Sequence, residues 1–304
     1  MVSDTSRNHL FLTSKSGNSV AVWDEVAGNI LTTIPVGNRP WGVTIANNRV
    51  FVGNNNSATV SVIDAATLTK IGDINLNNSK ADIQCIGGPT IAVSNPNTNR
   101  VYVGLYGAGR VAVIDATTNT LIDCLSANAG TFGVAINPNL NQLYVTNRDG
   151  MDLQVFDIST VPGRLVQDVK LGGVPFMVQA NPSTNKVYVM VAFDAGSYSL
   201  ANRLQAYSAT AGGVTLLNSS TIGNTDDGGT IWVSQASGAL YIAATSDGEA
   251  EIVDPTTLAM IGRIPMIDPF GITENFGLGR IYVGNRAANT FTILPDTYGP
   301  GAPP

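Results

Sequence analysis

The sequence predicts an all-β protein, a seven-bladed β-propeller of four-stranded antiparallel blades, from three observations. A short apolar strand with a central Phe or Tyr recurs seven times, at spacings of 40 to 53 residues. Further short β-branched segments follow each recurrence, separated by Gly, Pro, Asn and Thr. Repeats of this length with several strands per unit are typical of propeller blades, which bury their apolar faces only against neighbouring blades. The recurring strands are HLFLTS (9–14), RVFVGN (49–54), RVYVGL (100–105), QLYVTN (142–147), KVYVMV (186–191), ALYIAA (239–244) and RIYVGN (280–285).

The third unit shows the four strands of a predicted blade most clearly. Its β segments lie at 88–94, 100–105, 110–116 and 121–126, and we name them A, B, C and D. A four-stranded meander is not stable alone, so we expect the blades to pack face to face. The recurring aromatic of strand B is therefore expected to fill the interface between blades.

The turns between these strands repeat as well. Between A and B the chain reads NPNTN, NPNLN or NPSTN, in which Asn-Pro starts a turn and the closing Asn tolerates a positive φ. Between C and D an Asp precedes a Thr- or Ser-containing turn, and its carboxylate can accept a hydrogen bond from the backbone two residues on. We interpret these aspartates as turn caps rather than catalytic groups: Asp64, Asp115, Asp157 and Asp254.

The repeats predict one domain over residues 1–304, with repeat starts near 9, 49, 100, 142, 186, 239 and 280. The opening MVSDTSRNHLFLTS aligns with AVSNPNTNRVYVGL (92–105), so the chain starts inside a repeat and we expect an upstream stretch. After Leu294 no D strand is evident, and 295–304 is expected to be a C-terminal tail. Closure of the propeller is expected to be imperfect or completed by the terminal segments.

Composition restricts the function classes. The chain is 44% hydrophobic and only 12% charged, with a net charge of −6. No basic stretch exists to neutralise phosphates, which excludes nucleic acid as the expected partner. No apolar run is long enough for a membrane span, and no signal peptide is visible. The neutral, Gly-rich surface favours a periplasmic, extracellular or cell-surface location, where Cys85 and Cys124 could pair. Two buried thiols are the alternative.

One recurrence carries a family signature. The segment 142–147 contains Tyr144-Val145-Thr146-Asn147, and VAVIDATTNTLID (111–123) looks like the second half of the same repeat. From about residue 9 to 294 the chain resembles the YVTN-repeat β-propellers. The resemblance implies a surface-layer-like or periplasmic propeller that acts in binding or as a scaffold.

Related seven-bladed propellers include lactonases, a streptogramin-inactivating lyase and the heavy chain of amine dehydrogenases. The lyase depends on histidines, whereas this chain has one, His9, at the start of a B strand. Arg49, Arg100 and Lys186 occupy the same position, so we expect His9 to lie at a solvated site.

We expect any ligand on the face formed by the D–A and B–C loops, which we call the loop face. Aromatic rings with Asn and Arg nearby would suit a carbohydrate, peptide or protein partner. Apolar side chains that plug the channel mouth are the alternative. The predicted ligand-binding residues are Arg39, Trp41, Asn54, Phe132, Asn147, Arg148, Phe176, Phe270, Asn285 and Arg286.

The sixth unit brings carboxylates to the same kind of loop. Asp226, Asp227, Asp247 and Glu249 could bind a hard cation such as Ca²⁺, and a solvated acidic rim is the alternative. No nucleophile with an activating base is evident, and we interpret Glu274 as structural. A non-catalytic binding or scaffold protein without a cofactor is therefore the leading hypothesis. A metal-dependent hydrolase or lactonase that uses these carboxylates is the second.

Overall fold

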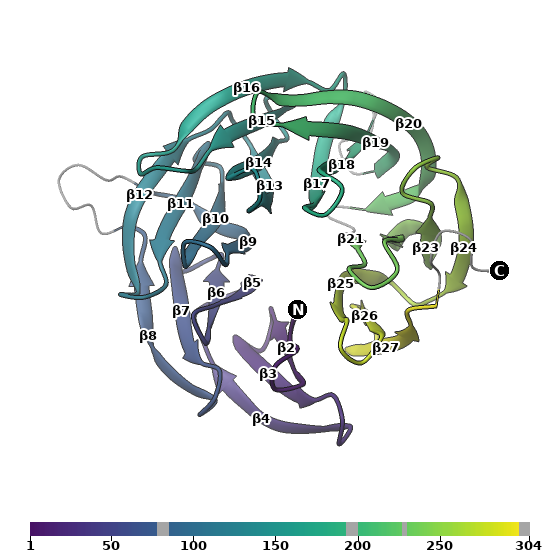
Figure 1. Ribbon diagram of the computed structural model, residues 1–304. Helices are drawn as coiled ribbons and strands as arrows, with labels where there is room; N and C mark the ends of the chain where they lie inside the picture. Colours follow the sequence, from purple (N-terminus) through teal and green to yellow (C-terminus); the bar gives the residue numbers. More distant parts are fainter. Residues whose placement is uncertain (78–84, 193–199, 227–229, 298–304) are drawn as a thin grey trace. The chain divides into compact units, whose positions relative to one another are not determined.

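The computed structural model describes residues 1–77, 85–192, 200–226 and 230–297 (Figure 1). Its strands form seven antiparallel sheets, each built from consecutive strands of the chain. The fold class is a seven-bladed β-propeller, as the sequence predicts. Six sheets have four strands, and the seventh has three within the described residues, where the sequence shows no D strand.

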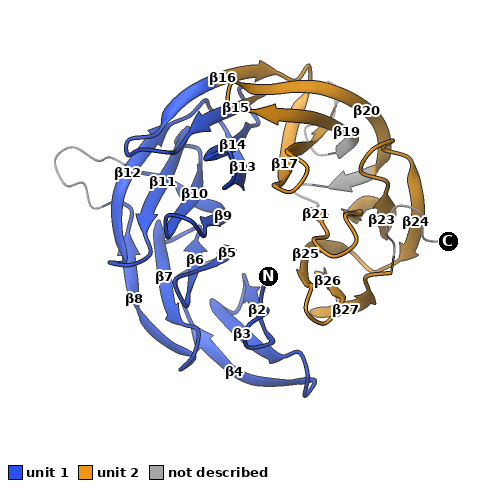
Figure 2. Cartoon of the chain, viewed as in Figure 1, with its two compact units in different colours: residues 1–150, 154–166 blue, residues 151–153, 167–304 orange. Residues whose placement is uncertain are grey.

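The chain forms two compact units, which Figure 2 shows in blue and orange. Unit 1 comprises residues 1–150 and 154–166, and unit 2 comprises 151–153 and 167–304. The prediction of a single domain stays a prediction.

Unit 1 holds three complete sheets in the chain order A to D. The first contains β1 (Val2–Asp4), β2 (His9–Ser14), β3 (Ser19–Asp24) and β4 (Asn29–Pro35). The second contains β5 (Pro40–Ala46), β6 (Arg49–Asn54), β7 (Thr59–Asp64) and β8 (Thr69–Asn75). The third contains β9 (Gly88–Asn95), β10 (Arg100–Tyr106), β11 (Arg110–Asp115) and β12 (Thr120–Ser126). The fourth begins with β13 (Thr131–Asn137) and β14 (Gln142–Asn147), and the unit boundary crosses its strands β15 (Asp152–Asp157) and β16 (Arg164–Lys170).

Unit 2 holds the last three sheets. The fifth contains β17 (Val174–Asn181), β18 (Lys186–Ala192), β19 (Leu200–Thr210) and β20 (Gly213–Asp226). The sixth contains β21 (Ile231–Val233), β22 (Leu240–Ala244), the 3₁₀ turn η1 (Thr245–Asp247), β23 (Glu249–Val253) and β24 (Met260–Pro265). The seventh contains β25 (Pro269–Asn275), β26 (Arg280–Asn285) and β27 (Thr290–Pro295).

Within each unit the core lies between successive sheets, because the apolar faces of their strands are buried there. Phe51 is fully buried with Val60 and Val62 of its own sheet and with Val101 and Val103 of the next. The same residue position is an almost completely buried aromatic in all seven blades, which confirms the predicted core role: Phe11, Phe51, Tyr102, Tyr144, Tyr188, Tyr241 and Tyr282.

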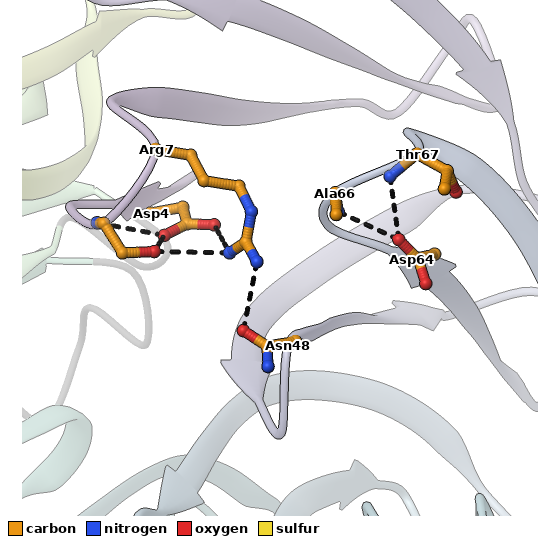
Figure 3. Close-up of polar contacts among 7 residues, drawn as sticks. Asp4, Arg7, Asn48, Asp64, Ala66 and Thr67 are labelled. Carbon is orange, nitrogen blue, oxygen red and sulfur yellow. Dashed lines mark hydrogen bonds and ion pairs between the residues drawn. The ribbon is translucent and has the colours of Figure 1, made fainter.

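The predicted turn chemistry is confirmed. Asp64 Oδ1 accepts hydrogen bonds from the backbone N–H of Ala66 (2.9 Å) and Thr67 (2.8 Å), which caps the C–D turn (Figure 3). In the A–B turns the closing Asn has a positive φ, for example 50° at Asn99. In the first blade Asp4 replaces the opening Asn, and Arg7 links its carboxylate to Asn48 of the second blade (Figure 3).

The first residue of strand B is less solvated than the sequence analysis expects. Arg49 Nη1 donates to the Ala116 carbonyl (2.8 Å) and the Thr117 carbonyl (2.9 Å) in the next blade. In unit 2, Lys186 Nζ likewise donates to the Pro255 carbonyl at 3.3 Å. These cations face the C–D turn of the following blade, where they donate to its carbonyls. His9, for which the solvated site is expected, is half-buried.

A disulfide in unit 1 and a hydrogen-bonded carboxylate in unit 2 each join separate segments of the chain. Cys85 and Cys124 form a disulfide, which joins the segment before β9 to β12 and decides between the two alternatives. In unit 2, Glu274 accepts hydrogen bonds from Trp232 Nε1 (3.2 Å) and the Gln235 N–H (2.8 Å), so its environment is that of a structural residue.

The last strand extends beyond the predicted start of the tail. Pro295 ends β27, and Asp296 accepts hydrogen bonds from the hydroxyls of Ser237 and Tyr241, both at 2.7 Å. Residues 298–304 of the predicted tail lie outside the described residues.

Candidate functional site

The D–A and B–C loops of unit 1 are joined by a recurring backbone hydrogen bond. The Asn55 N–H donates to the Arg39 carbonyl at 3.0 Å, and the Arg148 N–H donates to the Gly130 carbonyl at 2.9 Å. In unit 2 the Arg286 N–H donates to the Asp268 carbonyl at 3.0 Å. The two loop types therefore meet at the same end of each of these blades.

A β-bulge at the start of strand A positions the loop-face aromatics. The pairing of β5 with β6 shifts between Pro40 and Val43, where Trp41 lies. The pairing of β13 with β14 shifts between Thr131 and Val134, where Phe132 lies. Bulges turn a side chain away from the regular pleat and occur next to functional sites. The same shift recurs in unit 2 at Phe176 and Phe270.

Three aromatic rings and three cations gather on the loop face of unit 1, and we call them the aromatic–cation cluster. Phe132 contacts Trp41 and Tyr106 edge to face, with ring centres 5.9 Å and 6.3 Å apart. The cations lie over these rings: Lys15 Nζ is 3.5 Å from the centre of Trp41, Arg39 is 6.0 Å from it, and Arg148 is 5.3 Å from the centre of Phe132. In such cation–π contacts the positive charge lies over the face of an aromatic ring and is attracted by it.

Within this cluster the rings differ in exposure. Phe132 is 3% exposed and forms the floor, whereas Tyr106 is 43% exposed and Trp41 is half-buried. The cluster therefore offers the exposed ring of Tyr106, the partly exposed ring of Trp41 and three positive charges. This combination suits a ligand with both apolar surfaces and negative charge.

Beside the cluster lies an open depression of about 470 Å³ between the first two blades. It is bounded by the B–C loops of both blades and by the D–A loop between them. The lining residues are Lys15, Ser16, Asn18, Asn38, Arg39 and Asn56.

The predicted Asn residues are placed inside their blades. Asn54 is fully buried, and its Nδ2 donates to the hydroxyls of Thr59 (3.0 Å) and Ser61 (2.9 Å). Asn147 is also fully buried, accepts from Thr131 Oγ1 at 2.9 Å and donates to Gln154 Oε1 at 3.1 Å. Asn285 in unit 2 repeats the contacts of Asn54. These amides join strand B to strand C, and their predicted binding role stays a prediction.

In unit 2 the remaining predicted residues have local partners. Arg286 forms two hydrogen bonds of 2.9 Å with the Asp268 carboxylate and lies 4.9 Å above the Phe270 ring. Phe176 is fully buried. An acidic residue thus stands in the seventh blade where the second blade has Arg39.

The predicted metal ligands are described only in part. Asp227 lies outside the described residues, and Asp226 is described only as the end of β20. Glu249 lies 3.4 Å from Arg263 as an ion pair, and Asp247 ends η1. Among the residues with described positions, no group of three or more His, Cys, Asp or Glu side chains is arranged to hold a metal ion.

The same blade contains a carboxylate that the sequence analysis missed. Glu251 in β23 is completely buried and accepts hydrogen bonds from the Gly223 N–H at 2.9 Å and 3.0 Å. Burial raises the pKa of Glu251, and the nearby Glu249 raises it further. Alignment of the third strands could have revealed it, because Ser61 and Gln154 occupy the same inward position. Lys15 was also missed, although it lies in a B–C loop.

Comparisons with known proteins agree with the fold class. No protein-family model matches the chain. The seven-bladed beta-propeller protein Rv1057 of Mycobacterium tuberculosis is 27% identical over 155 residues, which are 49% of this chain and 37% of that protein. The chain thus spans well under two thirds of that relative's length.

A solved structure extends the likeness to almost the whole chain. Hydrazine synthase of Kuenenia stuttgartiensis superposes with a TM-score of 0.76 over 97% of this chain and 94% of that chain, at 17% identity. At this identity the likeness concerns the fold alone. Within the described residues, no helix has the length and apolar character of a membrane span.

Proposed function

We propose that this protein is a non-catalytic binding or scaffold propeller that engages a ligand or partner on its loop face. The aromatic–cation cluster of unit 1 carries the proposal. Aromatic rings next to cations and amides are the chemistry by which proteins hold carbohydrates and peptides. The bulges that place Trp41 and Phe132 there support this reading.

The side-chain inventory favours binding over acid–base catalysis. The whole sequence contains one histidine, His9, which lies at the start of β2 rather than in a loop of the loop face. Both cysteines are in the disulfide and are not available as nucleophiles. The cluster supplies recognition groups and lacks the paired nucleophile and base of covalent catalysis.

The resemblance to YVTN-repeat propellers belongs to this proposal, together with an exported location. The disulfide supports that location, because such bonds persist in oxidising compartments. The partial likeness to Rv1057 supports a propeller relative without identifying a ligand.

An array of defined oligosaccharides and peptides tests the proposed face. We expect wild type to bind at least one class of probe and Trp41→Ala to lose it. Trp23→Ala is the matched control, because Trp23 is also half-buried but lies at the C–D end of β3. Equal loss in both variants, or retention in both, would contradict a site at the cluster.

The alternative, a metal-dependent hydrolase of blade six, predicts different results. Elemental analysis of the purified protein would find a stoichiometric divalent metal. Esterase or lactonase turnover would then require that metal and disappear in Glu249→Ala. This outcome would replace the binding proposal.

A further inference from the structure

We propose that the open depression between the first two blades binds an acidic carbohydrate, namely a carboxylated oligosaccharide of the uronic-acid type. The proposal rests on the proposed function and deepens it by naming the ligand class. It places the negative group of the ligand at Arg39 and Lys15, and the neutral hydroxyls at the asparagines.

The lining defines the chemistry. Of its six residues, two are cations, three are asparagines and one is a serine. None of the six is acidic, although the chain as a whole has a net charge of −6. Amides donate to and accept from sugar hydroxyls, while Lys and Arg pair with carboxylates. Both positive charges attract an anionic ligand and repel a cationic one.

The backbone holds Arg39 in place on two sides. Its N–H donates to Asn18 Oδ1 at 2.9 Å in the first blade, and its carbonyl accepts from the Asn55 N–H at 3.0 Å in the second. The neighbouring Asn38 N–H donates to Ser57 Oγ at 2.8 Å. The loop is therefore fixed before any ligand arrives, which limits the entropy lost on binding.

Arg39 occupies a conformation that would suit glycine better. Its φ is +55°, and the equivalent residue in the fourth blade is Gly130, with φ +77°. A non-glycine residue in the left-handed region costs about 1 kcal/mol or more, and such outliers concentrate at binding sites. Asp268 at the equivalent position of the seventh blade also has a positive φ, of +51°, so the conformation belongs to the loop, and the exposed cation is what distinguishes the second blade.

The depression is open rather than enclosed, and it continues into the aromatic–cation cluster through Lys15. Lys15 lines the depression, and its Nζ lies 3.5 Å from the centre of the Trp41 ring. An extended chain of sugars can cross such a surface, with one residue in the depression and the next near the aromatic rings. The six lining residues offer no large apolar side chain to anchor a hydrophobic peptide residue.

Titration calorimetry with tetragalacturonate and its fully methyl-esterified form provides the test, in EDTA so that calcium does not bridge the sugars. The ester keeps every ring hydroxyl, removes the charges and adds one methyl group to each carboxyl group. We expect wild type to bind the acid form at least tenfold more tightly than the ester. Arg39→Gly is expected to weaken binding of the acid form at least tenfold without lowering the melting temperature, because glycine relieves the backbone strain. Arg164→Gln, which removes an exposed cation of the β16 strand, is expected to bind like wild type.

Several results would overturn this ligand class. They are equal affinity for the ester, full affinity in Arg39→Gly, absence of binding to the acid form, and Arg39-dependent binding of tetraglutamate in place of the sugar. Binding of a neutral glycan that is lost in Trp41→Ala would overturn the acidic carbohydrate and leave the proposed function standing. If no probe distinguishes wild type from the loop-face variants, both proposals fail.

Discussion

At the residue scale, single side chains connect neighbouring blades. The Arg49 guanidinium reaches two carbonyls in the C–D turn of the next blade within unit 1, and its Nη1 also donates to Asn119 Oδ1 at 2.8 Å. The sequence shows that a cation recurs at this position, but not where it points. Two of its three partners are backbone carbonyls 67 and 68 residues away, and no side-chain pattern in the sequence marks a carbonyl as an acceptor.

Replacement of Arg49 tests this inter-blade contact. Arg49→Ala leaves the part-buried Ala116 carbonyl without its charged donor, so we expect a loss of about 1.5–3 kcal/mol in the free energy of unfolding. Arg164→Gln removes an exposed cation 3.7 Å from Asp157 and should change stability by about 0.5 kcal/mol or less. Urea denaturation measures both. Equal losses of unfolding free energy in the two variants would show that the inter-blade contact stabilises the protein no more than an exposed ion pair does.

Glu251 predicts a pH dependence with a definite sign. Burial raises the pKa of Glu251 in the folded protein above its ordinary value of 4.5, so the folded state binds more protons than the unfolded state between pH 4.5 and the raised pKa. Its contribution therefore reduces stability as the pH rises from about 4.5 through the raised pKa, and the penalty persists above it. Glu251→Gln keeps the acceptor for the Gly223 N–H and removes the charge.

The measurement is chemical denaturation between pH 4.5 and 8 for wild type and Glu251→Gln. Aspartates with lowered pKa values, such as Asp64 and Asp254, act in the opposite direction and are common to both proteins. The variant should gain stability relative to wild type as the pH rises. A difference that is constant with pH would rule out a raised pKa at Glu251.

At the element scale, the sequence predicts the strands well and the loops poorly. Period-two apolar patterns and Asn-Pro or Asp turns define the strands because local chemistry specifies them. The position of Asn54, by contrast, depends on which hydroxyls strand C presents, and the amide is buried rather than displayed. The bulge at Trp41 depends on a register shift between strands, which composition does not encode. The sequence thus predicts a face and a set of residues for the candidate site, but neither the bulge nor the burial of the amides.

The disulfide is an element-scale constraint with a measurable effect. Cys85 and Cys124 are 39 residues apart, and the loop-entropy model gives about 4 kcal/mol for a loop of that length. Cys85→Ala/Cys124→Ala is expected to lose about 2–4 kcal/mol, since measured effects often fall below the model. Non-reducing denaturation of wild type and the double variant tests this. Identical midpoints would show that the bond does not constrain the unfolded chain.

At the scale of the whole molecule, the repeat pattern determines the fold class, because seven recurrences with buried aromatics allow few other architectures. The sequence also predicts one domain, which leads us to expect a single cooperative unfolding transition. Trp23 and Trp41 lie in unit 1 and Trp232 in unit 2, so Trp→Phe variants can report each unit separately. Coincident fluorescence transitions are expected. Two separate midpoints would show that the units unfold independently.

The central claim is that the aromatic–cation cluster of unit 1 is a binding site. Its most direct measurement follows Trp41 emission in a Trp23→Phe/Trp232→Phe background during titration with the best probe from the array. Because Trp41 is then the single tryptophan of the chain, a saturable change with the affinity found by calorimetry is the predicted result. Full binding by calorimetry with unchanged Trp41 emission, and undiminished affinity in Trp41→Ala, would place the site elsewhere and contradict the account.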